Sequence, residues 1–200
     1  MLFKIRALDE IISSWDGCKK CELHLERKNI VWWRGSPDAK IFAIGEGPGS
    51  EEDKLGVPFV GRAGRSLDQL FIWAGLKHEE DVFVANIVGC RPPNNRVPTT
   101  EEAKACRSRL VAMIQVVQPK VLLLMGATAS RRMAGITAIT RWCGCPTDVE
   151  ILAPNGQILE YIAIPTFHPS YLNRMGGNNE IKEQMLKDIK KAMELAGVKK

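Results

Sequence analysis

The chain has 200 residues, a net charge of +5, 45% hydrophobic residues and 26% charged residues. This length is enough for one domain with its own core, and the composition is that of an ordinary globular protein without repeats or low-complexity tracts. The mild excess of basic residues is compatible with nucleic-acid binding and equally with a merely basic enzyme.

The N-terminal stretch, residues 1–15, predicts an amphipathic helix and not a secretory signal. Its apolar residues recur at helical spacing, and charged residues such as Lys4 and Asp9 interrupt the apolar core that a signal requires. No apolar run is long enough to span a membrane. We therefore expect a cytoplasmic, reducing setting, where six cysteines act as metal ligands, reactive groups or buried apolar residues rather than disulfides.

Beyond this helix, segments typical of strands alternate with segments typical of helices. The strands are recognised as short apolar runs, and the helices by their apolar spacing and end signals, such as the capping-box pattern of Thr99 and Glu102. Strands are predicted at 39–45, 81–88, 120–126 and, as a strand or hairpin, 156–169. Helices are predicted at 63–76, 98–119, 127–135 and 178–197, and 141–156 is expected to be a mobile loop.

This alternation predicts an α/β fold in which helices cover both faces of a parallel sheet. In open sheets of this kind, ligands bind beyond the carboxyl ends of the strands. The stretch Gly45–Gly49, Asn86 and Gly126 all begin at such ends. The sequence therefore predicts that these positions border the functional site.

Three glycines, Gly45, Gly47 and Gly49, alternate directly after the first predicted strand. Their spacing misses the dinucleotide fingerprint, which needs glycine where Ser50 stands, and a P-loop needs a lysine that is absent here. We interpret the stretch as a pocket lining in which backbone amides approach a flat ligand. The ring of Phe59, in the next glycine-rich turn, is then either a stacking platform or a plug of the core beneath the loop.

The cysteines fall into pairs. Two residues separate Cys18 from Cys21, and fifteen separate Cys90 from Cys106. By spacing alone, four thiolates from two distant segments suit zinc and a 4Fe–4S cluster equally well, and unligated buried cysteines are the alternative. The remaining pair, at 143 and 145, is expected to form a turn with free thiols.

Three motifs in this order, GEGPGSEEDKLGVPFVGRAG, NIVGCRPPNNR and HPSYLNR, together with the first four cysteines, resemble the family 4 iron–sulfur uracil-DNA glycosylases. The resemblance covers roughly residues 15–195. It implies a single domain over residues 1–200, with three layers, α/β/α, around a central, mainly parallel four-stranded sheet. It also implies a 4Fe–4S cluster held by Cys18, Cys21, Cys90 and Cys106.

The same resemblance implies a monomer that removes uracil from single- or double-stranded DNA in base excision repair. Phe59 would stack on the extruded uracil, Asn86 would read its polar edge, and His168 would stabilise the charge that builds on the departing base. For Asn86 and His168, a strand-end turn residue and a hydrogen-bonded loop histidine are the alternatives.

Glu46 is expected to position or deprotonate the attacking water, or instead to structure its loop. The backbone at Gly45 and Gly47 would face the base. Asp53 is a backup candidate for the base, although its acidic run is more often a solvated helix start.

Four further residues are expected to meet the DNA. Ser170 would bond a phosphate, and Leu172 would insert as a wedge into the space that the flipped base leaves. Arg62 and Arg174 would hold the backbone, with a solvated surface role as the alternative.

Two rival interpretations remain open at this stage. One is a non-catalytic module on the same fold that binds DNA or nucleotide, and the other is a zinc-bound hydrolase of another class.

Overall fold

The structure is a computed structural model that describes residues 1–198; the last two residues of the predicted domain, 199 and 200, lie outside the described part. The helices are α1 (Leu2–Ser14), α2 (Ser50–Leu55), α3 (Arg62–Ala74), α4 (His78–Asp81), α5 (Thr100–Val117), α6 (Ala127–Ala134), α7 (Ile139–Trp142), α8 (Pro169–Arg174) and α9 (Asn179–Ala196), with 3-10 turns η1 (Glu22–His24) and η2 (Pro93–Asn95). The strands are β1 (Arg34–Gly35), β2 (Ile41–Gly45), β3 (Val82–Asn86), β4 (Val121–Met125), β5 (Thr147–Leu152) and β6 (Ile158–Thr166).

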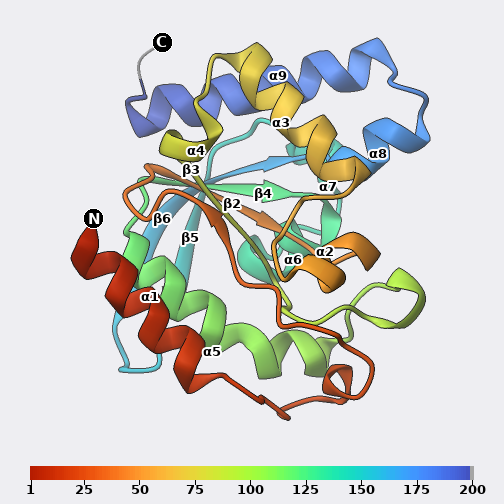
Figure 1. Ribbon diagram of the computed structural model, residues 1–200. Coiled ribbons are helices and arrows are strands. Elements are labelled where there is room, and N and C mark those ends of the chain that lie inside the picture. The colour runs from red at the N-terminus through yellow and green to blue at the C-terminus, as the bar shows by residue number, and fades with distance from the viewer. Residues whose placement is uncertain (199–200) are drawn as a thin grey trace.

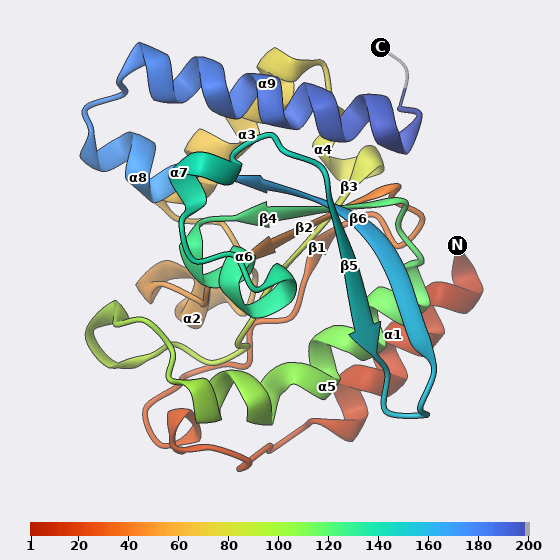
Figure 2. The ribbon, with the colours of Figure 1, turned by 180° about the vertical axis from the view of Figure 1, so that it is seen from behind.

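The strands form one six-stranded sheet in the order β1-β3-β2-β4-β6-β5 (Figures 1 and 2). The four inner strands are parallel, and β1 and β5 join the two edges antiparallel. The predicted class is confirmed, but the sheet has six strands rather than four. The two-residue β1 is too short to leave a periodic signal in the sequence.

The prediction of a loop over 141–156 is wrong for residues 147–152, which form β5 and pair with β6 as a hairpin. Val149 and Ile151 point into the core while their neighbours are exposed, which is the alternation of a half-buried strand. The two strands satisfy each other's backbone hydrogen bonds, and the hairpin runs down beside α1 and α5 in the view of Figure 2.

Helices cover both faces of the sheet and create two cores. The helices α1 and α5 lie below the sheet in the view of Figure 1, and α3 and α9 lie above it. Successive residues of a strand point to opposite faces of the sheet and so belong to different cores. Phe42 and Phe83 belong to the first core, and Ile41 and Val82 belong to the second. Because β2, β3 and β4 are buried at every position, they read as continuous apolar runs.

The ends of the long helices agree with the sequence signals. The capping box at the start of α5 is confirmed, since the Glu102 amide donates to Thr99 Oγ1 (3.1 Å) and the Thr99 amide donates to Glu102 Oε2 (2.7 Å). A hydrogen-bonded ion pair with Arg96 lowers the pKa of Glu102. Helix α3 ends at Gly75, whose φ of 92° is left-handed. No helix within residues 1–198 is both long and apolar enough to cross a membrane.

Candidate active site at the carboxyl ends of the parallel strands

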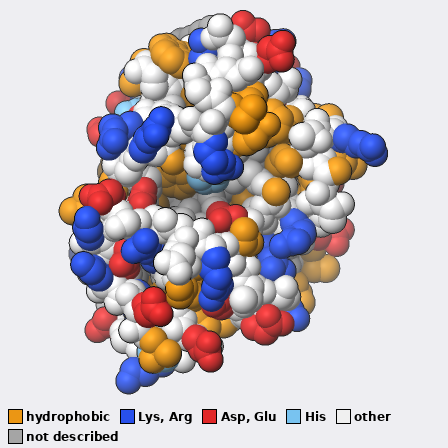
Figure 3. Space-filling view, turned by 90° about the vertical axis from the view of Figure 1, so that its right-hand side faces the viewer, with side chains coloured by type: hydrophobic (Ala, Val, Ile, Leu, Met, Phe, Trp, Pro, Cys, Tyr) orange, Lys and Arg blue, Asp and Glu red, His pale blue; other side chains and the backbone are white. Residues whose placement is uncertain are grey.

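A pocket of about 420 Å³ opens beyond the carboxyl ends of β2 and β3. These two strands run in register, with Gly45 opposite Asn86. Figure 3 shows the hollow with a histidine side chain inside it and lysine and arginine side chains around it. All three sequence motifs supply lining residues: Glu46, Gly47, Phe59, Arg62, Asn86, His168, Ser170 and Arg174. The structure therefore brings together nearly all of the residues that the sequence singled out for base and DNA contact.

The floor of the pocket is built around Gly45. A Cβ atom at this position would lie 2.4 Å from Asn86 Oδ1 and 2.6 Å from the Phe59 ring, so only glycine lets both side chains reach the backbone. Asn86 is 3% exposed, and its Oδ1 has no hydrogen-bond partner within the described part of the chain. A buried amide oxygen without a partner is costly, which indicates a site that a ligand completes.

The Phe59 ring lies between the core and the pocket. Its ring is 6% exposed and packs with the second core, yet it also lines the pocket. The backbone at Phe59 has a φ of 55°, which is unusual for a bulky residue. The start of α3 crowds this turn, because a Cβ at Gly64 would fall 1.7 Å from the carbonyl oxygen of Phe59. The loop thus fixes the ring against the pocket floor.

His168 follows β6 and caps the N-terminus of α8. Its Nδ1 accepts a hydrogen bond from the Ser170 amide (3.1 Å) and lies 2.8 Å from Ser170 Oγ, which in turn accepts from Arg174 Nη1 (3.1 Å). Burial, together with the positive charge of Arg174, lowers the pKa of His168 to about 4. The imidazole is therefore neutral at neutral pH, and because Nδ1 is an acceptor, the proton sits on Nε2.

Glu46 is anchored by a residue that no sequence motif indicated. Thr128 Oγ1, in the first turn of α6, donates to Glu46 Oε2, and Thr128 is buried. The carboxylate also borders a second hollow, of about 490 Å³, that shares His168 with the first. The only signal for Thr128 was its place just after Gly126, at the end of a predicted strand.

The structure contradicts the expectation for Leu172. Its side chain is 6% exposed and belongs to the core beneath the pocket, because the short helix α8 packs against α3. A buried leucine is not available to insert between bases, so the predicted wedge role is wrong for this conformation. By contrast, Arg62 and Arg174 remain exposed at the pocket and free to meet a phosphate backbone.

Asp53 is a structural residue. It is 3% exposed, and its Oδ1 accepts hydrogen bonds from the amides of Lys28 (2.9 Å) and Asn29 (3.3 Å). These bonds tie α2 to the segment that precedes β1. The alternative of a solvated helix start is therefore wrong, and Asp53 is not among the residues that line the pocket.

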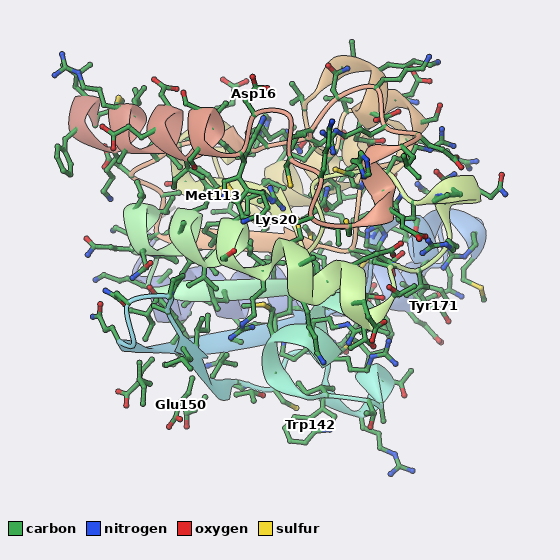
Figure 4. All side chains as sticks on the ribbon, turned by 90° about the horizontal axis from the view of Figure 1, so that it is seen from below. Asp16, Lys20, Met113, Trp142, Glu150 and Tyr171 are labelled. Carbon is green, nitrogen blue, oxygen red and sulfur yellow. The ribbon has the colours of Figure 1, made fainter. Side chains whose placement is uncertain are left out.

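The first four cysteines lie around one small cavity beside α5. Cys18 and Cys21 come from the segment after α1, and Cys90 and Cys106 from the connection after β3 and from α5. Figure 4 shows this meeting of segments near Lys20, with sulfur atoms close to it. Within residues 1–198, no group of three or more His, Cys, Asp or Glu side chains is arranged to hold a metal ion.

N–H groups contact two of the four sulfur atoms. The Gly89 amide and Arg109 Nε each lie 3.3 Å from Cys106 Sγ, and Arg27 Nη1 lies 3.5 Å from Cys90 Sγ. Burial raises the pKa of Cys90 to about 11, although Arg27 opposes this effect. Four cysteines on one cavity, with N–H groups contacting two of the sulfur atoms, are a donor set that fits an iron–sulfur cluster and equally a zinc ion.

The remaining cysteines lie elsewhere. Cys145 is exposed, and burial raises the pKa of Cys143 to about 12, so Cys143 is in the thiol form near neutral pH. Neither lines the cavity of the other four.

Comparison with known proteins gives one consistent family. The sequence profile described as the Uracil DNA glycosylase superfamily matches residues 32–190. The type-4 uracil-DNA glycosylase of Thermotoga maritima is 44% identical over 179 residues, which are 88% of this chain and 87% of that protein. The type-4 uracil-DNA glycosylase of Archaeoglobus fulgidus is 36% identical over 200 residues, which are 98% of this chain and 96% of that protein. The type-4 uracil-DNA glycosylase of Sulfurisphaera tokodaii is 35% identical over 193 residues, which are 94% of this chain and 82% of that protein. Because the profile and these relatives cover most of its length, the chain belongs to the type-4 uracil-DNA glycosylases of the uracil DNA glycosylase superfamily.

Proposed function

We propose that the protein removes uracil from DNA by hydrolysing the bond between the base and its deoxyribose, acting as a monomer in base excision repair. The observation that carries this proposal is the buried Asn86 amide, whose oxygen is unpartnered in the described chain and which lies beside the Phe59 ring at the pocket floor. Family membership supports the reaction class, and the lining of the pocket supports the choice of residues.

Base recognition follows from the chemistry of the floor. Extruding a base from a duplex costs a few kcal/mol, and stacking on Phe59 recovers about 1–3 kcal/mol. The Asn86 amide accepts from the uracil N3–H and donates to O4. Cytosine presents the reverse pattern, so its entry would leave buried polar groups unpaired.

The spacing of the rings sets how the base lies. The centroids of Phe59 and His168 are 5.8 Å apart. A flat ring sandwiched between them would need about 7 Å, twice the usual contact distance of about 3.5 Å. A uracil stacked on Phe59 therefore meets the imidazole with its edge, which is where its carbonyl oxygens lie.

The chemical step uses this edge. As the bond from C1′ to the base breaks, the electron pair stays with the base, and negative charge builds on its carbonyl oxygens. The neutral His168 donates its Nε2–H to one of these carbonyl oxygens, and Ser170 holds the imidazole ring through Nδ1. The sugar becomes positive, as in other glycoside cleavages. Water adds to C1′ and passes its proton to Glu46, which Thr128 orients.

The four cysteines at 18, 21, 90 and 106 are proposed to hold a 4Fe–4S cluster. When bound, the cluster would tie the N-terminal segment to α5, and it supplies no electron to a hydrolysis. Anaerobically purified protein is expected to be brown with about four irons per chain. A colourless preparation that contains zinc would contradict this assignment.

The test of the function is incision of a uracil-containing oligonucleotide, revealed by alkali, beside identical strands with thymine or cytosine. Asn86→Ala is expected to reduce incision by at least a hundredfold while its thermal unfolding stays that of the parent. The matched control is Asn155→Ala, in the exposed turn of the β5–β6 hairpin, which should keep full activity. An intact uracil strand with the wild-type protein would overturn the function, and full activity of Asn86→Ala would overturn the pocket assignment.

A further inference from the structure

Arg109 is the largest fully buried side chain of the described molecule. It stands on α5 one turn after Cys106, and its guanidinium reaches three acceptors. Nε lies 3.3 Å from Cys106 Sγ, Nη2 donates to the carbonyl oxygen of Asn86 (2.7 Å), and Nη1 donates to that of Val31 (3.4 Å). The ring of Trp32 lies 5.8 Å away. One side chain thus joins a cysteine of the thiol cavity to the residue at the pocket floor.

The charge of Arg109 has no carboxylate to balance it. Among the ion pairs of residues 1–198, none includes this guanidinium. A buried charge without a counter-charge is strongly destabilising. The neighbours that hold this guanidinium are the sulfur of Cys106 and the backbone carbonyl oxygens of Asn86 and Val31. These three contacts fix the side chain between the thiol cavity and the pocket floor.

The backbone between the two sites is held at several points. The Gly89 amide donates to Cys106 Sγ (3.3 Å), and the Gly89 carbonyl oxygen accepts from the Val31 amide (2.7 Å). A Cβ at Gly89 would come within 3.2 Å of the guanidinium, so the backbone lies directly on Arg109. The short segment from Asn86 to Cys90 consequently has few ways to move.

We propose that Arg109 is a positioning residue that couples the cavity of the four cysteines to uracil recognition. The guanidinium orients the backbone of Asn86 by donating to its main-chain carbonyl oxygen, and the sulfur of Cys106 fixes the guanidinium on its other side. Weakening either contact turns the side-chain amide of Asn86 away from the uracil edge. This inference rests on the proposed function, but it adds a dependence that uracil excision by itself does not require.

The test compares holoproteins of the wild type, Arg109→Lys and Arg109→Met, with Arg107→Met as a control from the same helix at a partly exposed position. A lysine ammonium keeps the charge but does not span sulfur and carbonyl oxygen together. Four quantities are measured: the inhibition constant of free uracil, the affinity for a uracil-free oligonucleotide, the iron content and the visible spectrum. For Arg109→Lys, we expect uracil inhibition at least tenfold weaker, a changed visible spectrum, and unchanged iron content and DNA affinity. Arg107→Met should match the wild type in all four.

Wild-type uracil inhibition in the Arg109→Lys holoprotein would overturn the proposal. So would a parallel loss of uracil and DNA affinity, because that pattern means general unfolding. If neither variant folds, wild-type protein depleted of iron replaces them. It must keep the affinity of the holoprotein for the uracil-free oligonucleotide and bind free uracil at least tenfold more weakly, and any other pattern overturns the proposal. A wild-type protein that fails to incise uracil strands defeats the proposed function instead, so the two failures are distinguishable.

Discussion

The backbone from Asn86 to Cys90 separates two cavities of opposite character. The base pocket is open and lined by polar side chains that point inward, several of them at the rim of the core. The thiol cavity is small, and two of its cysteines, Cys90 and Cys106, are 8% and 9% exposed members of the first core. The exposed pocket residues Arg62 and Arg174 can therefore change without disturbing the core, whereas Cys90 and Cys106 belong both to the thiol cavity and to the core.

The comparison predicts the largest effect at Cys90. In Cys90→Ala, we expect loss of iron and of most soluble protein, because a core residue and a ligand of the proposed cluster disappear together. Iron analysis and the yield of soluble protein measure this, and Cys145→Ala, at an exposed thiol, is the control. A soluble Cys90→Ala protein with full iron would erase the distinction between the two cavities.

The next effect is chemical and belongs to the pocket. His168→Ala is expected to lower the single-turnover rate of uracil excision by about 10²–10³, the usual loss when one donor to a developing anion is removed. Its melting temperature should stay within a few degrees of the wild type. A collapse of stability with this variant would mean that the pocket is no more separable from the core than the thiols are.

A smaller effect is expected beneath the pocket. Leu172→Ala should destabilise the protein by about 2 kcal/mol, the low end for a buried leucine, because water can enter from the neighbouring pocket. Urea unfolding measures this, with the exposed Leu152→Ala as control. If Leu172 is a core residue, excision from duplex and from single strands falls equally. A loss confined to duplex DNA would restore the wedge role.

The smallest effect concerns pH. The pKa of His168 is about 4 in the folded protein, because of burial, and about 6.5 in an unfolded chain. Between these values the unfolded chain binds more protons, so this residue's contribution to stability falls as pH drops from about 6.5 to 4. Between pH 7.5 and 5.5, the free energy of unfolding of the wild type should fall by about 1 kcal/mol more than that of His168→Gln. Parallel stability curves would show that the imidazole is not desolvated.

The periodic parts of the fold followed from the sequence. Local signals predict three buried strands and the helices α1, α3, α5 and α9. These signals are apolar spacing, a capping box and terminal glycines. The site edge followed as well, since parallel strands end together.

The remaining features depend on contacts between distant segments. Thr128 donates a hydrogen bond to Glu46, which lies 82 positions earlier in the sequence, and no local pattern around a threonine predicts so distant a partner. The local sequence around Leu172 is typical of a loop, and the residue is buried only because α8 packs against α3. Arg109 looks like any surface arginine of a long helix, apart from its place one turn after Cys106. Tertiary packing, not local pattern, decided each of these.

The alignment of Gly45 with Asn86 across two parallel strands constrains how this enzyme can diverge. Side chains alternate between the faces of a sheet, so deleting a single residue inside β3 would turn the Asn86 position toward the opposite helical layer. Insertions in the connection from α3 to β3 carry no such penalty, because the hydrogen-bonded ladder re-forms after them. Lineages of this enzyme are therefore expected to vary in the lengths of their connections and to keep the lengths of these two strands.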